Sequence, residues 1–278
     1  LIDLITKSSI TNKTERINLI KQNQLIGFEK SNTMYTLAIS NMLFRGDGKS
    51  KIFNIDFFKE DSLELLKDIN PTIGFMNPPF GGSDNSKNPT KKEIQFLVRM
   101  LDNVSRYGVI IAPISTYFKE NATRNRILTK HTLKYVINMP SELFQPNAST
   151  ITSIAVFETN LPHDSKEVVF YDLKDDGLVL SKHKGRTDRY NKWPEIQKDL
   201  LQKLKNPEQF QDRFTLVKNK IKNNDEWLIQ AHSETDYSVI DNKLFTTSIK
   251  KHLIFTLKSK LNLTNKDIDE ISLMEMIY

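Results

Sequence analysis

Short apolar segments alternate with segments of helical periodicity along the first 160 residues, and this alternation limits the chain to few folds. The expected strands are residues 24–29, 50–56, 73–77, 108–112 and 133–138. The expected helices between them are residues 31–45, 61–67, 90–106 and 121–130. Such alternation is typical of an α/β fold, in which a mostly parallel sheet carries helices on both faces. A further apolar segment, 152–158, follows without an intervening helix, so it is expected to run antiparallel to 133–138.

The second half of the chain follows a different pattern. NLPHDSK interrupts the alternation near residues 160–166, so we expect a first domain at 1–162 and an extension at 163–278. The extension begins with an expected strand at 166–173. Residues 206–278 read as mostly helical, with short strands conceivable near Trp227 and Tyr237.

Composition excludes several classes of protein. The 278 residues include no Cys, which rules out disulfides and thiolate metal sites, and the five His show no paired ligand spacing. We therefore expect no metal. No apolar run reaches the roughly 20 residues that span a bilayer, and no secretory signal is visible, so we expect a cytoplasmic location. The net charge of +6 suits a polyanion partner, but a Lys- and Asn-rich composition explains it equally well.

Polar residues stand at the ends of three expected strands. Glu29, Asp56 and Asn77 each follow an apolar segment. In open α/β sheets the carboxyl ends of parallel strands form one rim, where ligands bind. The three side chains are expected to converge there.

The segment Asn77-Pro78-Pro79-Phe80 matches the needs of a particular reaction. An exocyclic amino group on a purine or pyrimidine is a poor nucleophile, because its lone pair is delocalised into the ring. Two hydrogen-bond acceptors, one on each amino proton, localise the lone pair on the nitrogen. They stabilise the transition state more than the ground state. The Asn77 side-chain oxygen and the Pro78 carbonyl can be those acceptors. Pro79 restricts Pro78 to extended conformations, and Phe80 offers a ring for stacking.

These residues also carry a family resemblance. The segments IGFEKSNTMYTLAISNMLFRG, IFNIDFF, IGFMNPPFGG, YGVIIAPISTYF and MPSELFQPNASTITSIAVFE occur in the order seen in adenine-N6 DNA methyltransferases that use S-adenosylmethionine (AdoMet). The pattern resembles the modification subunits of type I restriction enzymes. It covers roughly residues 24–175, and it implies a Rossmann-like class I methyltransferase sheet with a largely helical C-terminal extension.

The resemblance implies a role for each matched residue. Glu29 would bind the ribose hydroxyls of AdoMet, Asp56 its adenine amino group, and Phe57 would pack on the adenine ring. Asn77, Pro78, Pro79 and Phe80 would hold the target adenine of double-stranded DNA, and Phe144 would stack on its other face. The base must leave the duplex, since its amino group is paired inside it.

One feature of the family is missing. Its members carry a loop of the form Asp-Pro-x-x-Gly-x-Gly after the first strand, whereas the 23 residues before Gln24 contain no Gly. Those residues resemble the helix that follows the loop. We therefore expect a sheet that lacks its first strand, as a fragment or as half of a split protein. AdoMet binding would then depend on the missing N-terminal part.

Two further segments suggest partners. Lys184, Arg186 and Arg189 lie in a basic loop that would contact DNA phosphates, although a solvated loop has the same composition. The amphipathic segment 248–261 would pack on its own domain or on a specificity subunit.

The sequence is compatible with three functions. The first is adenine-N6 methylation of DNA in a restriction-modification system. The second is methylation of protein glutamine or of an RNA amino group. The third is a non-catalytic fragment that binds DNA or a partner subunit.

Overall fold

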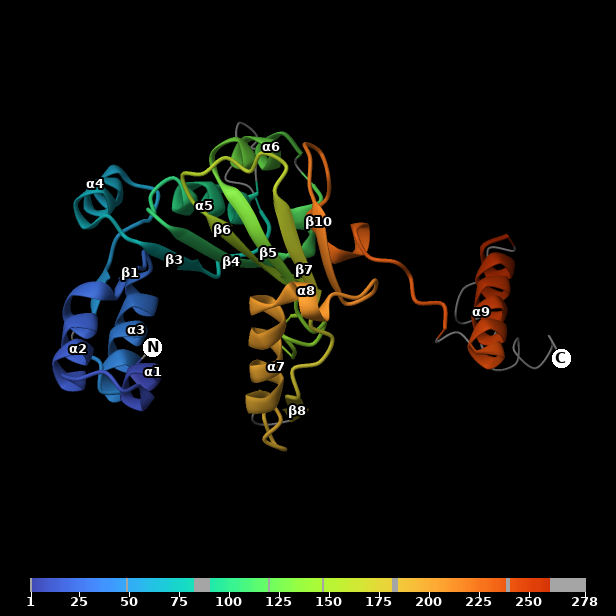
Figure 1. The fold of residues 1–278 in the computed structure, drawn as a ribbon, viewed down its shortest axis with the longest axis horizontal. Coiled ribbons are helices and arrows are strands. Elements are labelled where there is room, and N and C mark those ends of the chain that lie inside the picture. The colour runs from blue at the N-terminus through green and yellow to red at the C-terminus, as the bar shows by residue number, and fades with distance from the viewer. Residues whose placement is uncertain are drawn as a thin grey trace.

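The computed structural model describes residues 2–48, 50–82, 91–119, 121–146, 148–181, 185–238 and 241–260 (Figure 1). The helices are α1 (Ile2–Lys7), α2 (Lys13–Leu19), α3 (Asn32–Phe44), α4 (Glu60–Ile69), α5 (Lys92–Leu101), α6 (Asn121–Lys130), α7 (Trp193–Lys205), α8 (Pro207–Phe210) and α9 (Asn242–Lys260). The strands are β1 (Ile26–Phe28), β2 (Lys51–Phe53), β3 (Ile73–Met76), β4 (Tyr107–Pro113), β5 (Thr132–Asn138), β6 (Thr152–Glu158), β7 (Glu167–Asp172), β8 (Val179–Ser181), β9 (Gly185–Thr187) and β10 (Leu216–Lys220).

The main sheet has six strands in the order β10-β7-β5-β6-β4-β3. The predicted antiparallel pairing of β5 with β6 is confirmed. The prediction of a mostly parallel sheet is wrong for the described residues, because β4–β6, β5–β6 and β10–β7 pair antiparallel and only β3–β4 and β5–β7 pair parallel in this sheet. The sheet is therefore mixed.

Helices cover both faces of this sheet, as predicted. Neighbouring residues of a strand point to opposite faces, and Val136 and Ile137 of β5 belong to two different core clusters. On one face α5 and α6 contribute side chains such as Leu97 and Ile127. On the other face α7 contributes Ile196 and its neighbours. The central strand β5 is thus fixed by burial on both sides.

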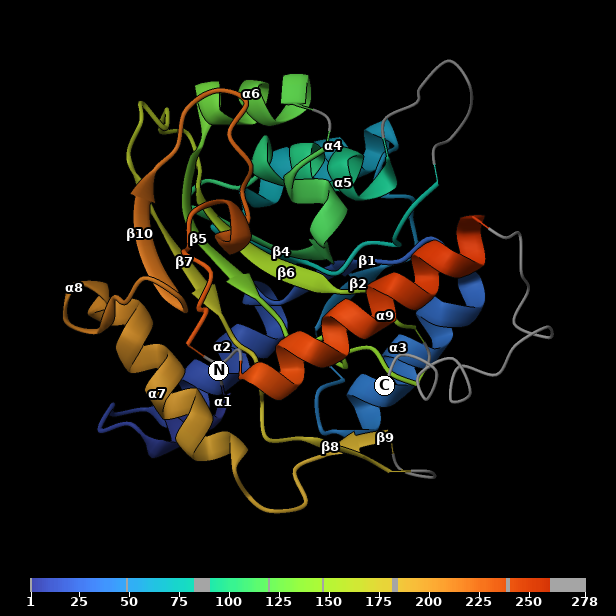
Figure 2. The ribbon, with the colours of Figure 1, turned by 90° about the vertical axis from the view of Figure 1, so that its right-hand side faces the viewer.

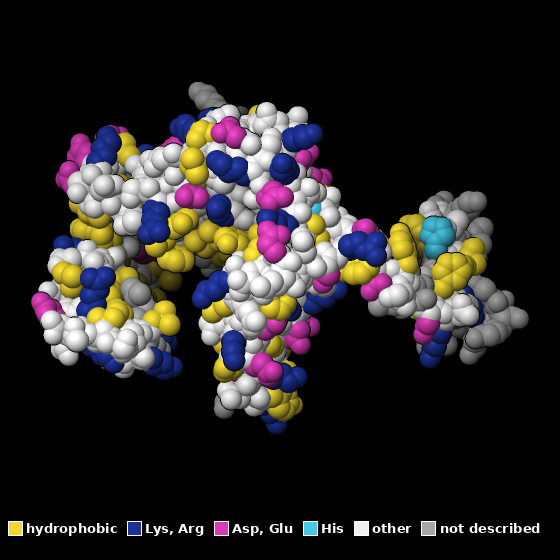
Figure 3. Space-filling model, in the orientation of Figure 1, with side chains coloured by type: hydrophobic (Ala, Val, Ile, Leu, Met, Phe, Trp, Pro, Cys, Tyr) yellow, Lys and Arg dark blue, Asp and Glu magenta, His cyan; other side chains and the backbone are white. Residues whose placement is uncertain are grey.

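Strands β1 and β2 form a separate parallel pair. They lie with α1, α2 and α3 in a group beside β3, the edge strand of the main sheet (Figure 1). Ser31 is the N-cap of α3, and its side chain accepts a hydrogen bond from the Met34 N–H at 3.4 Å. In Figure 3 hydrophobic side chains gather in the notch between this group and the sheet.

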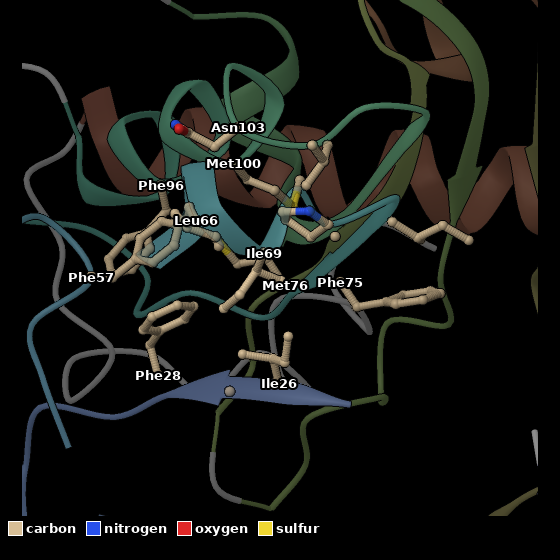
Figure 4. A pocket seen from close by; sticks show the side chains of 15 residues that line it. Ile26, Phe28, Phe57, Leu66, Ile69, Phe75, Met76, Phe96, Met100 and Asn103 are labelled. Carbon is tan, nitrogen blue, oxygen red and sulfur yellow. The ribbon is translucent and has the colours of Figure 1, made fainter. Parts of the chain in front are cut away.

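A mostly apolar cavity of about 310 Å³ lies between β1 and β3 (Figure 4). Side chains of Ile26 and Phe28 from β1 point across it toward Met76 of β3 and toward α5. Phe75 of β3 is 77% exposed. An edge strand that exposes this much apolar surface is unusual, because unpaired strand edges invite further pairing.

The C-terminal half differs from the prediction. Among the described residues after 206, α8 and α9 form, but β10 joins the main sheet beside β7. No strand forms at Trp227, whose side chain is buried in the core, or at Tyr237. The predicted boundary at residue 162 stays a prediction, although β7 and β10 beyond it belong to the main sheet.

Helix α9 stands apart from the sheet in Figure 1, and Figure 2 shows it in front of the body when the molecule is turned by 90°. Among the described residues no helix is long and apolar enough to cross a membrane.

Candidate functional site

One cavity of about 640 Å³ brings together residues that follow the three N-terminal strands β1, β2 and β3. This volume lies within the range of small-molecule sites. Glu29, Asp56 and Asn77 all line it, so the predicted convergence is confirmed. The other lining residues are Phe28, Lys30, Ile55, Phe57, Phe58, Pro78, Pro79, Lys92, Gln95 and Phe96.

Glu29 follows β1 and is held by the start of α3. Its Oε1 accepts a hydrogen bond from the Ser31 N–H at 2.7 Å. The Glu29 N–H donates to the Phe53 carbonyl at 3.0 Å, which continues the β1–β2 ladder by one step. These two bonds orient a half-buried carboxylate toward the cavity, where it can accept hydrogen bonds from hydroxyl groups.

Asp56 lies in the turn between β2 and α4. Its Oδ1 accepts from the Phe58 N–H at 3.0 Å, and its Oδ2 lies 3.3 Å from the Lys30 ammonium. The Phe58 N–H, and then Lys30, lower the pKa of the Asp56 carboxyl below its ordinary value. Asp56 therefore stays ionised at neutral pH and acts as an acceptor.

Aromatic rings form a wall of the cavity. Phe57 stacks on Phe96 with ring centroids 5.8 Å apart and planes 3° from parallel, and it meets Phe28 at 5.7 Å. Sequence reasoning missed Phe96. Its position off the apolar stripe of α5 was the available sign, because an aromatic residue off the core-facing stripe needs another neighbour.

The Asn77-Pro78-Pro79 segment presents its acceptors to the cavity. Asn77 and Pro79 are exposed, whereas the Pro78 ring is buried and anchors the segment. Within the described part of the chain, neither the Asn77 side chain nor the Pro78 carbonyl takes part in a hydrogen bond. Two acceptors adjacent in sequence are thus available to a ligand that carries an amino group.

Phe80 and Phe144 are brought together although 64 positions separate them in the sequence. Their ring centroids lie 5.5 Å apart in an edge-to-face arrangement. Phe144 lies in the turn before β6, and both rings are half-buried. A planar group inserted between two parallel rings needs a centroid distance of roughly 7 Å, twice an ordinary stacking distance. The rings must therefore part to admit one.

The predicted DNA-contacting residues have different surroundings. Lys184 lies outside the described residues. Arg186 of β9 is 7% exposed and pairs with Asp176 and, at 3.3 Å, with Glu142, so its guanidinium serves contacts within the chain. Arg189 is exposed, with its guanidinium 5.9 Å from the Tyr190 ring centroid. On the face shown in Figure 3, Lys and Arg side chains are scattered among acidic ones.

Comparison with protein families gives one match over most of the chain. The family described as N-6 DNA Methylase matches residues 4–238. This span contains every residue assigned above to the site.

Two curated relatives share sequence with this chain. The type II restriction enzyme and methyltransferase RM.BcgI of Heyndrickxia coagulans is 31% identical over 217 residues, which cover 75% of this chain and 33% of the relative. The type I restriction enzyme EcoEI methylase subunit of Escherichia coli is 27% identical over 175 residues, covering 58% and 35%. The chain thus spans about a third of the length of either relative.

Solved structures share the fold at lower identity. A modification subunit of a putative type I restriction enzyme from Vibrio vulnificus YJ016 superposes with a TM-score of 0.59 at 15% identity, covering 77% of this chain and 46% of the other. A structure described as the basis of complex assembly and conformational transition of the type I R-M system reaches 0.65 at 16% identity, covering 94% and 58%.

Proposed function

Because the chain belongs to the N-6 DNA methylase family, we propose that it takes part in methyl transfer from AdoMet to the N6 amino group of adenine in DNA, within a restriction-modification system. The observation that carries the proposal is the shared cavity, which joins Glu29 and Asp56 to Asn77 and Pro78. Carboxylates for a nucleoside lie in it beside acceptors for an amino group.

The residues present suit AdoMet, which supplies the methyl group when bound. Glu29 carries a carboxylate for the two ribose hydroxyls, and only its Oε1 is engaged, by Ser31. The ionised Asp56 carboxylate accepts from an adenine amino group, and Phe57 supplies a ring for the adenine plane. A nucleoside site requires an acceptor for each hydrogen-bond donor of the nucleoside and an aromatic ring against the base.

Asn77 and Pro78 act on the target amino group. The Asn77 side-chain oxygen and the Pro78 carbonyl accept one N6 proton each, which localises the nitrogen lone pair for attack on the methyl group. Neither group changes its charge, so the residues act by position and dipole rather than by proton storage. The methylated nitrogen then gives up one proton to solvent water.

Phe80 and Phe144 then hold the extruded base. Their rings touch in this structure, so the base enters as they separate, and stacking on both faces replaces the contact between them. Extrusion costs unpairing and unstacking, which such stacking partly offsets.

The cavity between β1 and β3 favours a second candidate, a chain that binds DNA or a subunit but transfers no methyl group by itself. We infer that the cavity accepts one more strand, which would join the two sheets into one class I methyltransferase sheet. A strand there would bring its following loop to the AdoMet cavity. The exposed apolar residues of α9, among them Phe245, Ile249 and Phe255, would dock on a specificity subunit.

The test is AdoMet binding followed by methyl transfer. Calorimetric titration is made with the chain alone and after addition of a synthetic strand-and-loop peptide bearing the family's Gly-rich motif. We expect the peptide to tighten AdoMet binding, and radiolabelled methyl groups to appear on duplex DNA rather than on protein or RNA. If DNA is methylated neither by the chain alone nor after the peptide is added, the second candidate, a non-catalytic binding chain, is favoured.

Asn77→Ala tests the proposed chemistry. We expect methyl transfer to fall by a factor of about 100 or more, as when one preorganised polar contact to a transition state is removed. AdoMet and DNA affinities should change little. Asn206→Ala, at the exposed end of α7, is the matched control. Near-normal methylation by Asn77→Ala would contradict the assignment.

A further inference from the structure

Glu93 is a fully buried carboxylate beside the Asn77–Phe80 segment. It lies in the first turn of α5 and its exposed fraction is 0%. Its Oε2 accepts a hydrogen bond from the Gly81 N–H at 3.0 Å. Its Oε1 is buried and makes no hydrogen bond within the described part of the chain. Burying a carboxylate with one oxygen unsatisfied is costly, so some other requirement keeps it there.

The hydrogen bond fixes the peptide that directly follows the base-holding ring. The Gly81 N–H belongs to the peptide plane between Phe80 and Gly81, so Glu93 holds the end of the Phe80 backbone. A second bond, from the Lys92 N–H to the Gly82 carbonyl at 3.1 Å, ties the next residue to the same helix. Gly81 and Gly82 have φ of 71° and 73°, a backbone conformation that residues with a side chain rarely adopt.

A favourable interaction with the dipole of α5 does not explain why Glu93 is buried. A carboxylate near a helix N-terminus is favourable because it faces the positive end of the helix dipole. An exposed side chain achieves this, as Glu60 of α4 and Glu195 of α7 do in their own first turns. Glu93 differs from them in being buried and in bonding a loop 12 residues away.

We propose that Glu93 is a positioning residue for the base site. By fixing the Phe80–Gly81 peptide, it sets the direction of the Phe80 ring and the path of the backbone that carries the Pro78 carbonyl. This role rests on the proposed methyl transfer, since Glu93 touches neither AdoMet nor the base. A displacement of 1 Å at such a site lowers a rate by roughly a factor of 100.

The first test measures the hydrogen bond itself. The chain has nine Gly, so selective ¹⁵N-glycine labelling yields a spectrum in which amide exchange of Gly81 can be followed alone. We expect Glu93→Ala to speed Gly81 exchange about tenfold, and Glu93→Gln, which keeps an acceptor oxygen, to restore protection. Gly108, in the core strand β4, should be unaffected. Equal acceleration of Gly81 and Gly108, or unchanged Gly81 exchange, would overturn the proposal.

The second test measures methyl transfer in an enzyme preparation that methylates DNA. Glu93→Ala should lower kcat about 10- to 100-fold with little change in the KM for AdoMet, and Glu93→Gln should recover most of it. Glu195→Ala is the control for a first-turn carboxylate. Unchanged kcat in Glu93→Ala overturns the positioning role even if Gly81 exchange responds. If the wild-type protein methylates no DNA, the proposed function is contradicted. If Gly81 exchange still becomes faster in Glu93→Ala, the Glu93–Gly81 hydrogen bond is nevertheless confirmed.

Discussion

Two phenylalanine rings from distant parts of the chain meet beside Asn77, and in the proposed function they stack on the extruded base. Phe80 follows the strand end that carries Asn77, and Phe144 arrives from the turn before β6. Their mutual contact keeps both rings half-buried. It also provides two stacking faces once they separate.

Phe144→Ala should therefore weaken retention of the base. Stacking on an aromatic side chain is worth about 1–3 kcal/mol per base, so the extruded population should fall by a factor of about 5 to 100. A fluorescent base analogue at the target adenine reports that population. Phe214→Ala, half-buried and remote from Asn77, is the control. An unchanged signal would make Phe144 an ordinary packing residue.

At the scale of elements, the hairpin of β8 and β9 is joined to the turn that carries Phe144. Arg186 of β9 pairs with the buried Asp176 and reaches Glu142, two residues before Phe144. A buried arginine with two carboxylate partners is an anchor for a loop, because the guanidinium can bond both at once. The Arg186–Glu142 pair therefore ties the β8–β9 hairpin to the turn that carries Phe144.

Arg186→Ala should affect stability, whereas Arg189→Ala should affect DNA binding. Breaking the buried Arg186–Asp176 pair leaves a carboxylate unpaired, so we expect a loss of about 3–5 kcal/mol of unfolding free energy, measured by urea denaturation. The exposed Arg189→Ala should leave stability unchanged and lower DNA affinity, with a smaller salt dependence. Equal stability of the two variants would show that the Arg186 pairs contribute little.

For the molecule as a whole, buried histidines make stability depend on pH. His131 and His163 are 3% and 2% exposed, and desolvation lowers the pKa of both below the ordinary value. Both ring nitrogens of His163 lack hydrogen bonds within the described residues. Such a group binds a proton more readily in the unfolded chain, so acidification favours unfolding.

We therefore expect the melting temperature to fall as pH is lowered through about 6.5, the ordinary histidine pKa. Above that pH both states hold neutral imidazoles, and their contribution to the pH dependence vanishes. Each kcal/mol lost lowers Tm by about 2–4 °C in a chain of this size. His163→Leu should flatten the curve between pH 5.5 and 7. An unchanged slope in that variant would assign the pH dependence to other groups.

The sequence by itself determined seven of the strands and the convergence of Glu29, Asp56 and Asn77. Apolar periodicity located the segments that became β1 to β7, because the period of 2 or 3.6 is a property of neighbouring residues. The strand-end positions of Glu29, Asp56 and Asn77 predicted that they would meet. The Asn-Pro-Pro-Phe order predicted the chemistry, since it depends on which groups are adjacent.

Only the tertiary structure decided how these pieces are arranged and which charged groups are internal. The mixed strand directions, the addition of β10 beside β7, and the gap between β1 and β3 depend on contacts between residues far apart in the chain. For the same reason the sequence predicts Arg186 as a DNA contact and gives no sign that Glu93 is buried. A charged residue is buried when distant segments bring it a partner, and local sequence carries no record of that partner.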